Sequence, residues 1–409
     1  MGASPASWND RPVDIEEARV ATSPDALALL GSLPPYRARD ALAQGAALRS
    51  AGASAELAAA VLTQSRLRAR AHVKFGDFAD GMAFTTEGLE QATRLEVAAL
   101  HAERFRSAGI DRVADLTAGI GADAMAMAAI GLAVMAFEID HATALIADHN
   151  LRHWERAVVV HADSIPTVRD VDVDGVFADP GRRRASARRH RPEDYLPPLD
   201  AVLALRDAYP ALGVKVGPGI PHSAPPADSE TEWVSVDGDV VEAGIWCGPL
   251  ARREGRAALV VSQGRAHGIA DDGAVASVGP LGPYLYEPDG AVIRAGLVAE
   301  VADRLGGALV DPTIAYVTAP SAIPTPFASG YRVVDDLPFG VKRLKAYLRE
   351  RGVGRVTIKK RGTAVTPEEL RRQLSLRGDA EATVILTRVA GHQRAIVVKP
   401  LDEVADATR

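Results

Sequence analysis

The chain has 409 residues, of which 47% are hydrophobic, enough for two or three domains with apolar cores. Its first residues do not resemble a secretory leader, and no apolar run reaches the ~18 residues of a membrane span. The single cysteine, Cys247, excludes an intramolecular disulfide and a cysteine-cluster metal site. The ten histidines have no spacing typical of metal ligands, so no metal is expected. These features predict a cytoplasmic protein.

The first block, residues 14–108, is expected to be a helical N-terminal domain. Predicted helices begin at Pro24 and run over Ala41–Ser50 with Asp40 as cap, over Ala55–Ala71, and over Glu87–Arg106 with Thr86 as cap. Lys74 and Phe75 then fall in a loop, where a lid would bring them against substrate or cofactor. Core packing is the alternative for Phe75.

The most informative stretch is Asp115–Asp123, which reads Asp-Leu-Thr-Ala-Gly-Ile-Gly-Ala-Asp. It follows the apolar pair Val113-Ala114 and leads into Ala124–Ile130, a pattern typical of strand, glycine turn and helix. Such a turn brings backbone N–H groups close to a ligand. A second strand, Leu132–Phe137, ends on Glu138, about 20 residues beyond the glycines, where a carboxylate can bind ribose hydroxyls. The pattern predicts a nucleoside-containing cofactor.

Two cofactor classes use this layout. Gly119-Ile120-Gly121 followed by Ala124 is compatible with dinucleotide binding. Asp115, however, stands just ahead of the turn, where a carboxylate would repel a pyrophosphate. The same carboxylate would attract the ammonium or sulfonium of S-adenosylmethionine. Asp115 therefore favours S-adenosylmethionine as the cofactor.

Further strands and a hairpin follow in order. They are predicted over Ala157–His161, Asp174–Ala178 and Leu212–Val216, with Glu232–Val236 and Val241–Trp246 pairing around Asp237-Gly238-Asp239. A parallel α/β sheet closed by an antiparallel hairpin is the Rossmann-like layout of class I methyltransferases. In such sheets the ligand lies beyond the carboxyl ends of the strands. Four carboxylates fall at such ends, those of Asp115, Glu138, Asp163 and Asp179.

Several short motifs carry a resemblance to a known family. They are Lys74-Phe75-Gly76, Gly88–Thr93, Asp115–Asp123, Asp179–Arg183, Lys215–Ile220, Glu232–Ser235, Tyr284–Asp289 and Ile358–Gly362. The chain resembles bacterial class I S-adenosylmethionine-dependent methyltransferases that carry a THUMP-like C-terminal domain, which are related to the RNA cap guanine-N2 (trimethylguanosine synthase) methyltransferases. The resemblance covers nearly the whole chain.

The resemblance implies roles for individual residues. Cofactor binding is implied at Asp115, Thr117, Ala118, Gly119, Gly121, Glu138, Asp140 and Asp163. Within that set Glu138 would bind the ribose and Asp163 the adenine. Catalysis is implied at Asp179 and Pro180, where Asp179 would hold the acceptor nitrogen with its lone pair facing the methyl group.

One departure from related enzymes follows Pro180. Amino-directed methyltransferases carry Asn/Asp-Pro-Pro-aromatic at this place, but here Gly181 and Arg182 come next. The ring that stacks on a base is therefore missing or supplied from elsewhere. We expect Arg182 and Arg183, which open a run of basic residues ending at Arg191, to bind phosphates of the substrate. A solvated loop is the alternative for this run.

The C-terminal part is more basic than the rest. From Val341 onward there are 16 Lys/Arg and 8 Asp/Glu, so this segment has a net charge of +8. Because the whole chain has a net charge of −6, residues 1–340 have a net charge of −14. Such asymmetry is typical of a nucleic-acid-binding module attached to a catalytic one, although a solvated basic face is the alternative. The predicted elements are a helix over Ala291–Gly306, a linker over Ala319–Pro326, helices over Phe339–Arg351 and Pro367–Leu376, and strands over Arg355–Lys360, Ala382–Val389 and Arg394–Val398.

These inferences predict four parts. They are a helical N-terminal domain (14–108), a class I methyltransferase domain (109–262), a connecting region (263–330) and a small basic α/β THUMP-like domain (331–409). The expected function is S-adenosylmethionine-dependent methylation of a nucleobase nitrogen in structured RNA. The alternatives are a small-molecule methyltransferase and a non-catalytic protein that binds S-adenosylmethionine or RNA. The sequence leaves the oligomeric state open.

Overall fold

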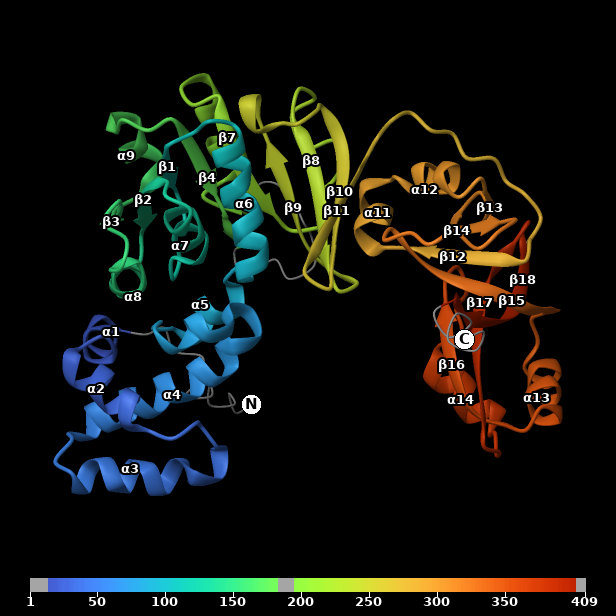
Figure 1. Ribbon diagram of the computed structural model, residues 1–409, viewed down its shortest axis with the longest axis horizontal. Helices are drawn as coiled ribbons and strands as arrows, with labels where there is room; N and C mark the ends of the chain where they lie inside the picture. Colours follow the sequence, from blue (N-terminus) through green and yellow to red (C-terminus); the bar gives the residue numbers. More distant parts are fainter. Residues whose placement is uncertain (1–13, 183–194, 402–409) are drawn as a thin grey trace, which may run out of the picture. The chain divides into compact units, whose positions relative to one another are not determined.

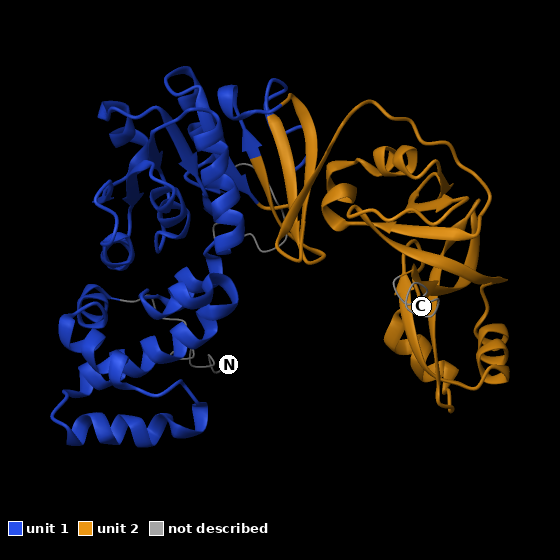
Figure 2. Cartoon of the chain, viewed as in Figure 1, with its two compact units in different colours: residues 1–216, 220–229, 245–252 blue, residues 217–219, 230–244, 253–409 orange. Residues whose placement is uncertain are grey.

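The computed structural model describes residues 14–182 and 195–401, except for the side chain of Arg182. The chain forms two compact units (Figure 2). The first comprises residues 1–216, 220–229 and 245–252, and the second comprises residues 217–219, 230–244 and 253–409. None of the helices in the described ranges is long and apolar enough to cross a membrane.

Helices fill the N-terminal part, as predicted (Figure 1). They are α1 (Ile15–Ala21), α2 (Pro24–Ser32), α3 (Ala41–Ser50), α4 (Ala55–Phe75), α5 (Thr86–Gln91) and α6 (Leu95–Ser107). Helix α3 has the predicted bounds, but the Asp40 side chain makes no capping hydrogen bond. Helix α4 continues to Phe75, so Lys74 and Phe75 belong to its last turn and the loop predicted for them is wrong.

The helix predicted over Glu87–Arg106 is two helices. The chain leaves helical geometry between Gln91 and Leu95, and the cap of the first helix is Thr85, whose hydroxyl accepts from the Gly88 N–H at 2.9 Å. Neither Gly nor Pro marks the break, so the pattern of apolar residues does not reveal it. The break turns the backbone of residues 92–94 toward the ends of the neighbouring strands.

The central sheet has nine strands. They are β1 (Arg112–Asp115), β2 (Ala133–Glu138), β3 (Ala157–His161), β4 (Gly175–Ala178), β7 (Ala211–Val216), β8 (Glu230–Val236), β9 (Asp239–Trp246), β10 (Gly255–Ser262) and β11 (Arg265–Ala270). Their order is β11-β10-β8-β9-β7-β4-β1-β2-β3. Strand β1 lies between β2 and β4 and is parallel to both, with Asp115 opposite Ala136 and Phe177.

The sheet confirms the strands and the hairpin predicted for this part of the chain. Strands β8 and β9 are neighbours joined through Asp237 and Gly238, whose φ angles of 48° and 89° are those of a tight hairpin turn. Strand β11 pairs antiparallel with β10, although it falls in the range predicted as a connecting region. The boundary at residue 262 therefore runs through the turn of a hairpin.

The first unit has one large apolar core that joins the N-terminal helices to the parallel strands. Helices α7 (Ala122–Ala129) and α8 (His141–Leu151) follow β1 and β2, and α9 (Ser164–Thr167) and α10 (Leu199–Leu203) are short. A two-residue ladder pairs β5 (Gly181–Arg182) with β6 (Tyr195–Leu196). Phe75 of α4, Phe105 of α6 and Phe177 of β4 belong to the same cluster of buried side chains. The N-terminal helices are thus packed onto the parallel strands.

The second unit contains a seven-stranded sheet. Its strands, in spatial order, are β13 (Ala308–Asp311), β14 (Ile314–Ala319), β12 (Tyr284–Pro288), β15 (Ala328–Pro338), β18 (His392–Pro400), β17 (Ala380–Val389) and β16 (Val353–Lys360). Residues 320–327 connect two strands that both pair with β12, so the predicted linker lies inside one sheet and does not separate domains. The helix predicted over Ala291–Gly306 is divided into α11 (Gly290–Ala295) and α12 (Val298–Arg304) by Gly296 at φ 75°.

Helices α13 (Val341–Glu350) and α14 (Pro367–Leu374) were predicted to within a few residues. Their apolar residues Leu344, Leu348, Leu370 and Leu374 are buried in one cluster with Val384 and Val397 of the sheet. The opposite helix faces are basic and exposed at Lys342, Arg343, Arg349, Arg371 and Arg372. This division of apolar and basic faces is what an amphipathic helix on a sheet requires.

Gly88 tests how tightly α5 packs on the glycine turn. A Cβ at Gly88 would lie 2.3 Å from Ile120 Cγ2 and 2.7 Å from Thr85 Oγ1, whereas a Cβ at Gly31 of α2 meets nothing within 4 Å. Gly88→Ala should therefore lower the free energy of unfolding by about 1–3 kcal/mol in urea denaturation. The matched control Gly31→Ala should be neutral or stabilising by up to about 1 kcal/mol. Equal effects of the two substitutions would contradict the packing described.

Candidate active site

A pocket of about 470 Å³ opens at the carboxyl ends of the parallel strands in the first unit. This volume lies in the range of about 300–1,000 Å³ usual for small-ligand sites. Its lining comes from the glycine turn after β1, from the ends of β2, β3 and β4, from the segment before α6, and from β6 and α10. The pocket therefore lies where an open parallel sheet is expected to bind its ligand.

The structure brings most of the predicted residues to this pocket. Those that line it are Thr117, Ala118, Gly119, Glu138, Asp163 and Asp179. Asp115 is buried behind the lining, with 1% of its surface exposed, and its Oδ1 accepts from the Thr117 N–H at 3.1 Å. Gly121 caps α7 with φ 87°, and Asp140 caps α8 through the Thr143 N–H. These three residues shape the lining without being part of it.

Lys74 and Phe75, which were expected to contact substrate, do not line the pocket. Phe75 is 1% exposed in the core, 5.8 Å from the ring of Phe84, so it packs and does not contact the pocket. Lys74 also lies away from the lining, as does the buried Pro180. Arg183 and the side chain of Arg182 lie outside the described residues. Contacts of these two arginines with substrate stay a prediction.

Glu138 is held in place by the backbone. Its Oε2 accepts from the Gly119 N–H at 2.9 Å, and its Oε1 accepts from the Asp140 N–H at 2.8 Å. Burial raises the pKa of Glu138 above its ordinary value, although these N–H groups oppose that shift. Asp163 is exposed beside it and caps α9 through the Ile165 N–H at 3.3 Å. Two carboxylates on adjacent strand ends are thus available to hydroxyl and amino donors.

The glycine turn is anchored from a distant helix. Asn150 of α8 is 2% exposed, and its amide nitrogen donates to the carbonyls of Ile120 at 2.8 Å and Ala83 at 3.0 Å. Its oxygen accepts from the Ala83 N–H at 2.8 Å. One side chain therefore ties the turn to the segment that precedes α5, and the buried amide has partners for both of its ends.

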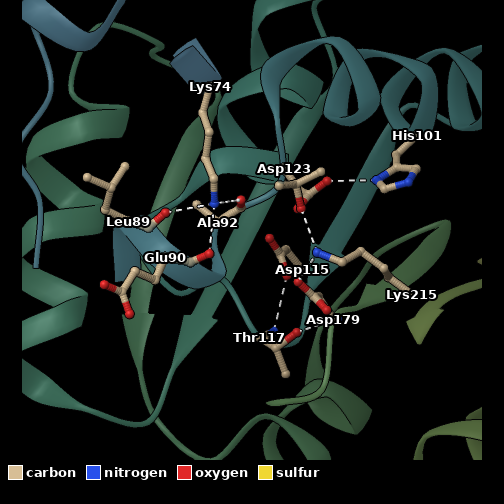
Figure 3. A network of polar contacts seen from close by, with 11 residues as sticks. Lys74, Leu89, Glu90, Ala92, His101, Asp115, Thr117, Asp123, Asp179 and Lys215 are labelled. Atoms are coloured by element: carbon tan, nitrogen blue, oxygen red, sulfur yellow. Dashed lines mark hydrogen bonds and ion pairs between the residues drawn. The ribbon is translucent and has the colours of Figure 1, made fainter. Parts of the chain in front are cut away.

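Asp179 lies at the end of β4 in a network that the sequence did not reveal (Figure 3). Its backbone N–H donates to Thr117 Oγ1 at 2.6 Å, and its Oδ2 lies 2.5 Å from Lys215 Nζ. Lys215 belongs to β7, where it interrupts an otherwise apolar strand. That interruption is the signal that could have identified Lys215 from the sequence.

The network continues into the protein interior. Lys215 Nζ donates to Thr93 Oγ1 at 2.8 Å, and the Thr93 hydroxyl donates to Asp123 Oδ2 at 2.6 Å. His101 Nδ1 lies 2.8 Å from Asp123 Oδ1. Burial alone would raise the pKa of Asp123, but His101, Lys215 and Thr93 together hold it below its ordinary value. Burial raises the pKa of Asp115 well above its ordinary range, and the nearby charge of Asp123 adds to this rise.

Lys74 binds the backbone carbonyls at the C-terminal end of α5. Its ammonium donates to the carbonyls of Leu89, Glu90 and Ala92, each at 2.8 Å (Figure 3). These carbonyls have no helical partner because the helix ends there. The next residue, Thr93, lines the pocket, so Lys74 supports the site from behind. Burial, followed by the charges of Lys215 and Arg94, lowers the pKa of Lys74 to about 8.

The depressed pKa of Lys74 makes stability depend on pH. The unfolded chain binds more protons than the folded chain between about pH 8 and pH 10.5, so this group increases the free energy of unfolding as pH rises through that window. The free energy of unfolding of wild type, relative to that of Lys74→Met, should therefore increase from about pH 8 to pH 10.5 in urea denaturation. A difference that stays flat or falls with rising pH would show that Lys74 is not desolvated as described.

Among the described residues, no cluster of three or more His, Cys, Asp or Glu side chains is arranged to hold a metal ion. The carboxylates of Asp123, Glu138, Asp163 and Asp179 line the pocket and give it a negative potential that attracts a cationic ligand.

Parts of this chain are similar to known protein families and structures. Residues 328–400 match the THUMP domain-like family, and residues 14–71 match a domain of unknown function. In a crystal structure, a proposed methyltransferase from Porphyromonas gingivalis W83 has a similar fold, with a TM-score of 0.73 and 21% identity over 95% of this chain and 99% of that one. This similarity confirms the fold class predicted for the methyltransferase part.

A sequence relative identifies the family. An uncharacterized S-adenosylmethionine-dependent methyltransferase of Mycobacterium tuberculosis is 33% identical over 355 residues, which cover 82% of this chain and 95% of the relative. The relative is thus similar over most of both chains. The protein therefore belongs to the S-adenosylmethionine-dependent methyltransferases, and S-adenosylmethionine is its cofactor.

Proposed function

We propose that this methyltransferase transfers the methyl group to a nucleobase nitrogen of a structured RNA. The observation that carries the proposal is the THUMP domain-like segment, residues 328–400, on the same chain as the methyltransferase pocket. THUMP domains bind structured RNA. This segment has 16 Lys or Arg against 7 Asp or Glu, a net charge of +9, and its two helices expose basic faces. Positive charge of this density suits a phosphate backbone.

Within the pocket, Glu138 would bind the ribose of S-adenosylmethionine and Asp163 the adenine amino group. Both side chains line the pocket, and the backbone orients each of them. Asp115 would orient the turn that faces the methionine part by accepting from the Thr117 N–H, because its own side chain is buried behind that residue. The carboxylates that line the pocket would also favour the positive sulfonium over the neutral sulfur of the product that leaves.

Asp179 would hold the acceptor nitrogen. Its carboxylate lines the pocket and is fixed at both ends, by Thr117 at the backbone and by Lys215 at the side chain. An amino group that donates its hydrogens to this carboxylate points its lone pair toward the methyl group. The sulfonium is already activated, so positioning of the acceptor supplies most of the rate. The more specific relation to cap guanine-N2 enzymes stays a prediction, since Gly181 and Arg182 stand where amino-directed methyltransferases carry a second Pro and an aromatic ring.

Label transfer tests the proposed substrate. Wild-type protein would be incubated with tritiated S-adenosylmethionine and with separate tRNA and rRNA fractions from cells that lack this gene. Label in one RNA fraction, absent with RNA from the parent cells, supports the proposal. Label confined to a small-molecule extract would favour a metabolite methyltransferase, and cofactor binding without any transfer would favour a binding protein.

Glu138→Ala should weaken binding of S-adenosylhomocysteine by about 10–100-fold, because it removes charged hydrogen bonds to the ribose. Calorimetry would measure the affinity, and the melting temperature would confirm that the turn at Gly119 still folds. Asp148→Ala removes an exposed carboxylate of α8 that does not line the pocket, so it serves as the matched control. Equal affinities of the two variants would contradict the role of Glu138.

Asp179→Ala should abolish methyl transfer and leave the affinity for S-adenosylhomocysteine within about threefold of wild type. The side chain would contact the acceptor rather than the cofactor, so the loss should appear in kcat. Single-turnover label transfer with the RNA fraction found above would measure it, again with Asp148→Ala as control. Full activity of Asp179→Ala would contradict the proposed role of Asp179 in binding the acceptor.

A further inference from the structure

Lys215, near the carboxyl end of β7, places its ammonium beside Asp179 on the proposed acceptor side of the pocket. Its side chain is only 14% exposed, and its Nζ lies 2.5 Å from Asp179 Oδ2 and 2.8 Å from Thr93 Oγ1 (Figure 3). Ordering a long side chain in an apolar strand costs conformational entropy, and removing its ammonium from water costs more. A place in the reaction would account for these costs.

The hydrogen bonds along the network have one possible direction. Lys215 has only donors, so Thr93 Oγ1 must accept from it. The single hydroxyl hydrogen of Thr93 then goes to Asp123 Oδ2, which accepts it. The low pKa of Asp123 agrees with this, and His101 completes the chain at Asp123 Oδ1. The interior end of the network is thus a fixed acceptor that keeps Lys215 oriented.

Asp179 needs a cation nearby because its other charged neighbours include several carboxylates. Among the residues that the structure describes, the titratable groups that face it or reach it through the network include Lys215 of β7, Asp115 of β1, Glu138 of β2, Asp123 of α7, His101 of α6 and Lys74 of α4. Repulsion from the carboxylates favours a protonated Asp179, and the Lys215 ammonium opposes this. A protonated Asp179 would donate a hydrogen bond and could no longer align an amino group through both of its oxygens.

We propose that Lys215 is a positioning residue of the acceptor subsite, which holds the Asp179 carboxylate ionised and aimed into the pocket. Thr93, Asp123 and His101 hold Lys215 in turn. The inference rests on the proposed function, since it takes Asp179 as the group that binds the acceptor. During transfer the sulfur keeps the electron pair of the broken S–C bond. The nitrogen lone pair forms the new N–C bond, and the nitrogen then releases a proton to water.

Titration of Asp179 tests this role directly. In full-length protein saturated with S-adenosylhomocysteine, the carboxyl carbon of Asp179 would be followed by ¹³C NMR and assigned with Asp179→Asn. Lys215→Met should raise the midpoint of Asp179 by about one pH unit or more, and Lys215→Arg should keep it close to wild type. An unchanged midpoint in Lys215→Met, with S-adenosylhomocysteine still bound, would overturn the proposal.

Thr93→Val provides a second test, because it keeps the ammonium and removes only the hydroxyl that orients it. If Lys215→Met fails to fold, a raised Asp179 midpoint in Thr93→Val supports the proposal and an unchanged one overturns it. With an RNA substrate, the rising limb of the pH profile of kcat should move to higher pH in Lys215→Met, while the KM for S-adenosylmethionine stays constant. Wild type without activity on any RNA would contradict the proposed function, and the titration would still decide the role of Lys215.

Discussion

The repulsion among carboxylates at the ends of parallel strands is the constraint on which the site depends. Strands β1, β2 and β4 run side by side in one direction, so Asp115, Glu138 and Asp179 must end at the same edge. Asp123 adds a fourth carboxylate from α7. Each is accommodated separately. Backbone N–H groups bind Glu138, His101 lies against Asp123, and Lys215 is paired with Asp179. Asp115 is buried, and its pKa is raised well above its ordinary range. A cationic cofactor relieves the same repulsion from the pocket side.

The N-terminal helices contribute to this arrangement through one helix break. Lys74 from α4 takes up the free carbonyls at the end of α5, and Thr93 then reaches both Lys215 and Asp123. Without the break, residues 92–94 would continue the helix and Thr93 could not join the network. The sequence suggests that the N-terminal helices form a lid over the site. In the structure they pack on the same core as the strands and form part of the wall of the site.

The sequence reveals the strands and their ends because these depend on local pattern. Apolar runs that stop at Asp115, Glu138 and Asp179 predict both the sheet and the edge at which the pocket lies. The network is different, since Thr93 and Lys215 are 122 residues apart and no local rule connects them. The break before Leu95 also has no Gly or Pro to mark it. The Pro-rich stretch around Ile323 resembles a linker but joins two strands of one sheet, which only the long-range pairing with β12 reveals.

Nucleoside analysis of cells that carry Asp179→Asn in the chromosomal gene tests the central claim most directly. The account predicts that one methylated nucleoside disappears from tRNA or rRNA, and that wild-type protein restores it in the extracted RNA. RNA with an unchanged nucleoside content, together with the loss of a methylated small molecule, would contradict the claim that the pocket serves an RNA base.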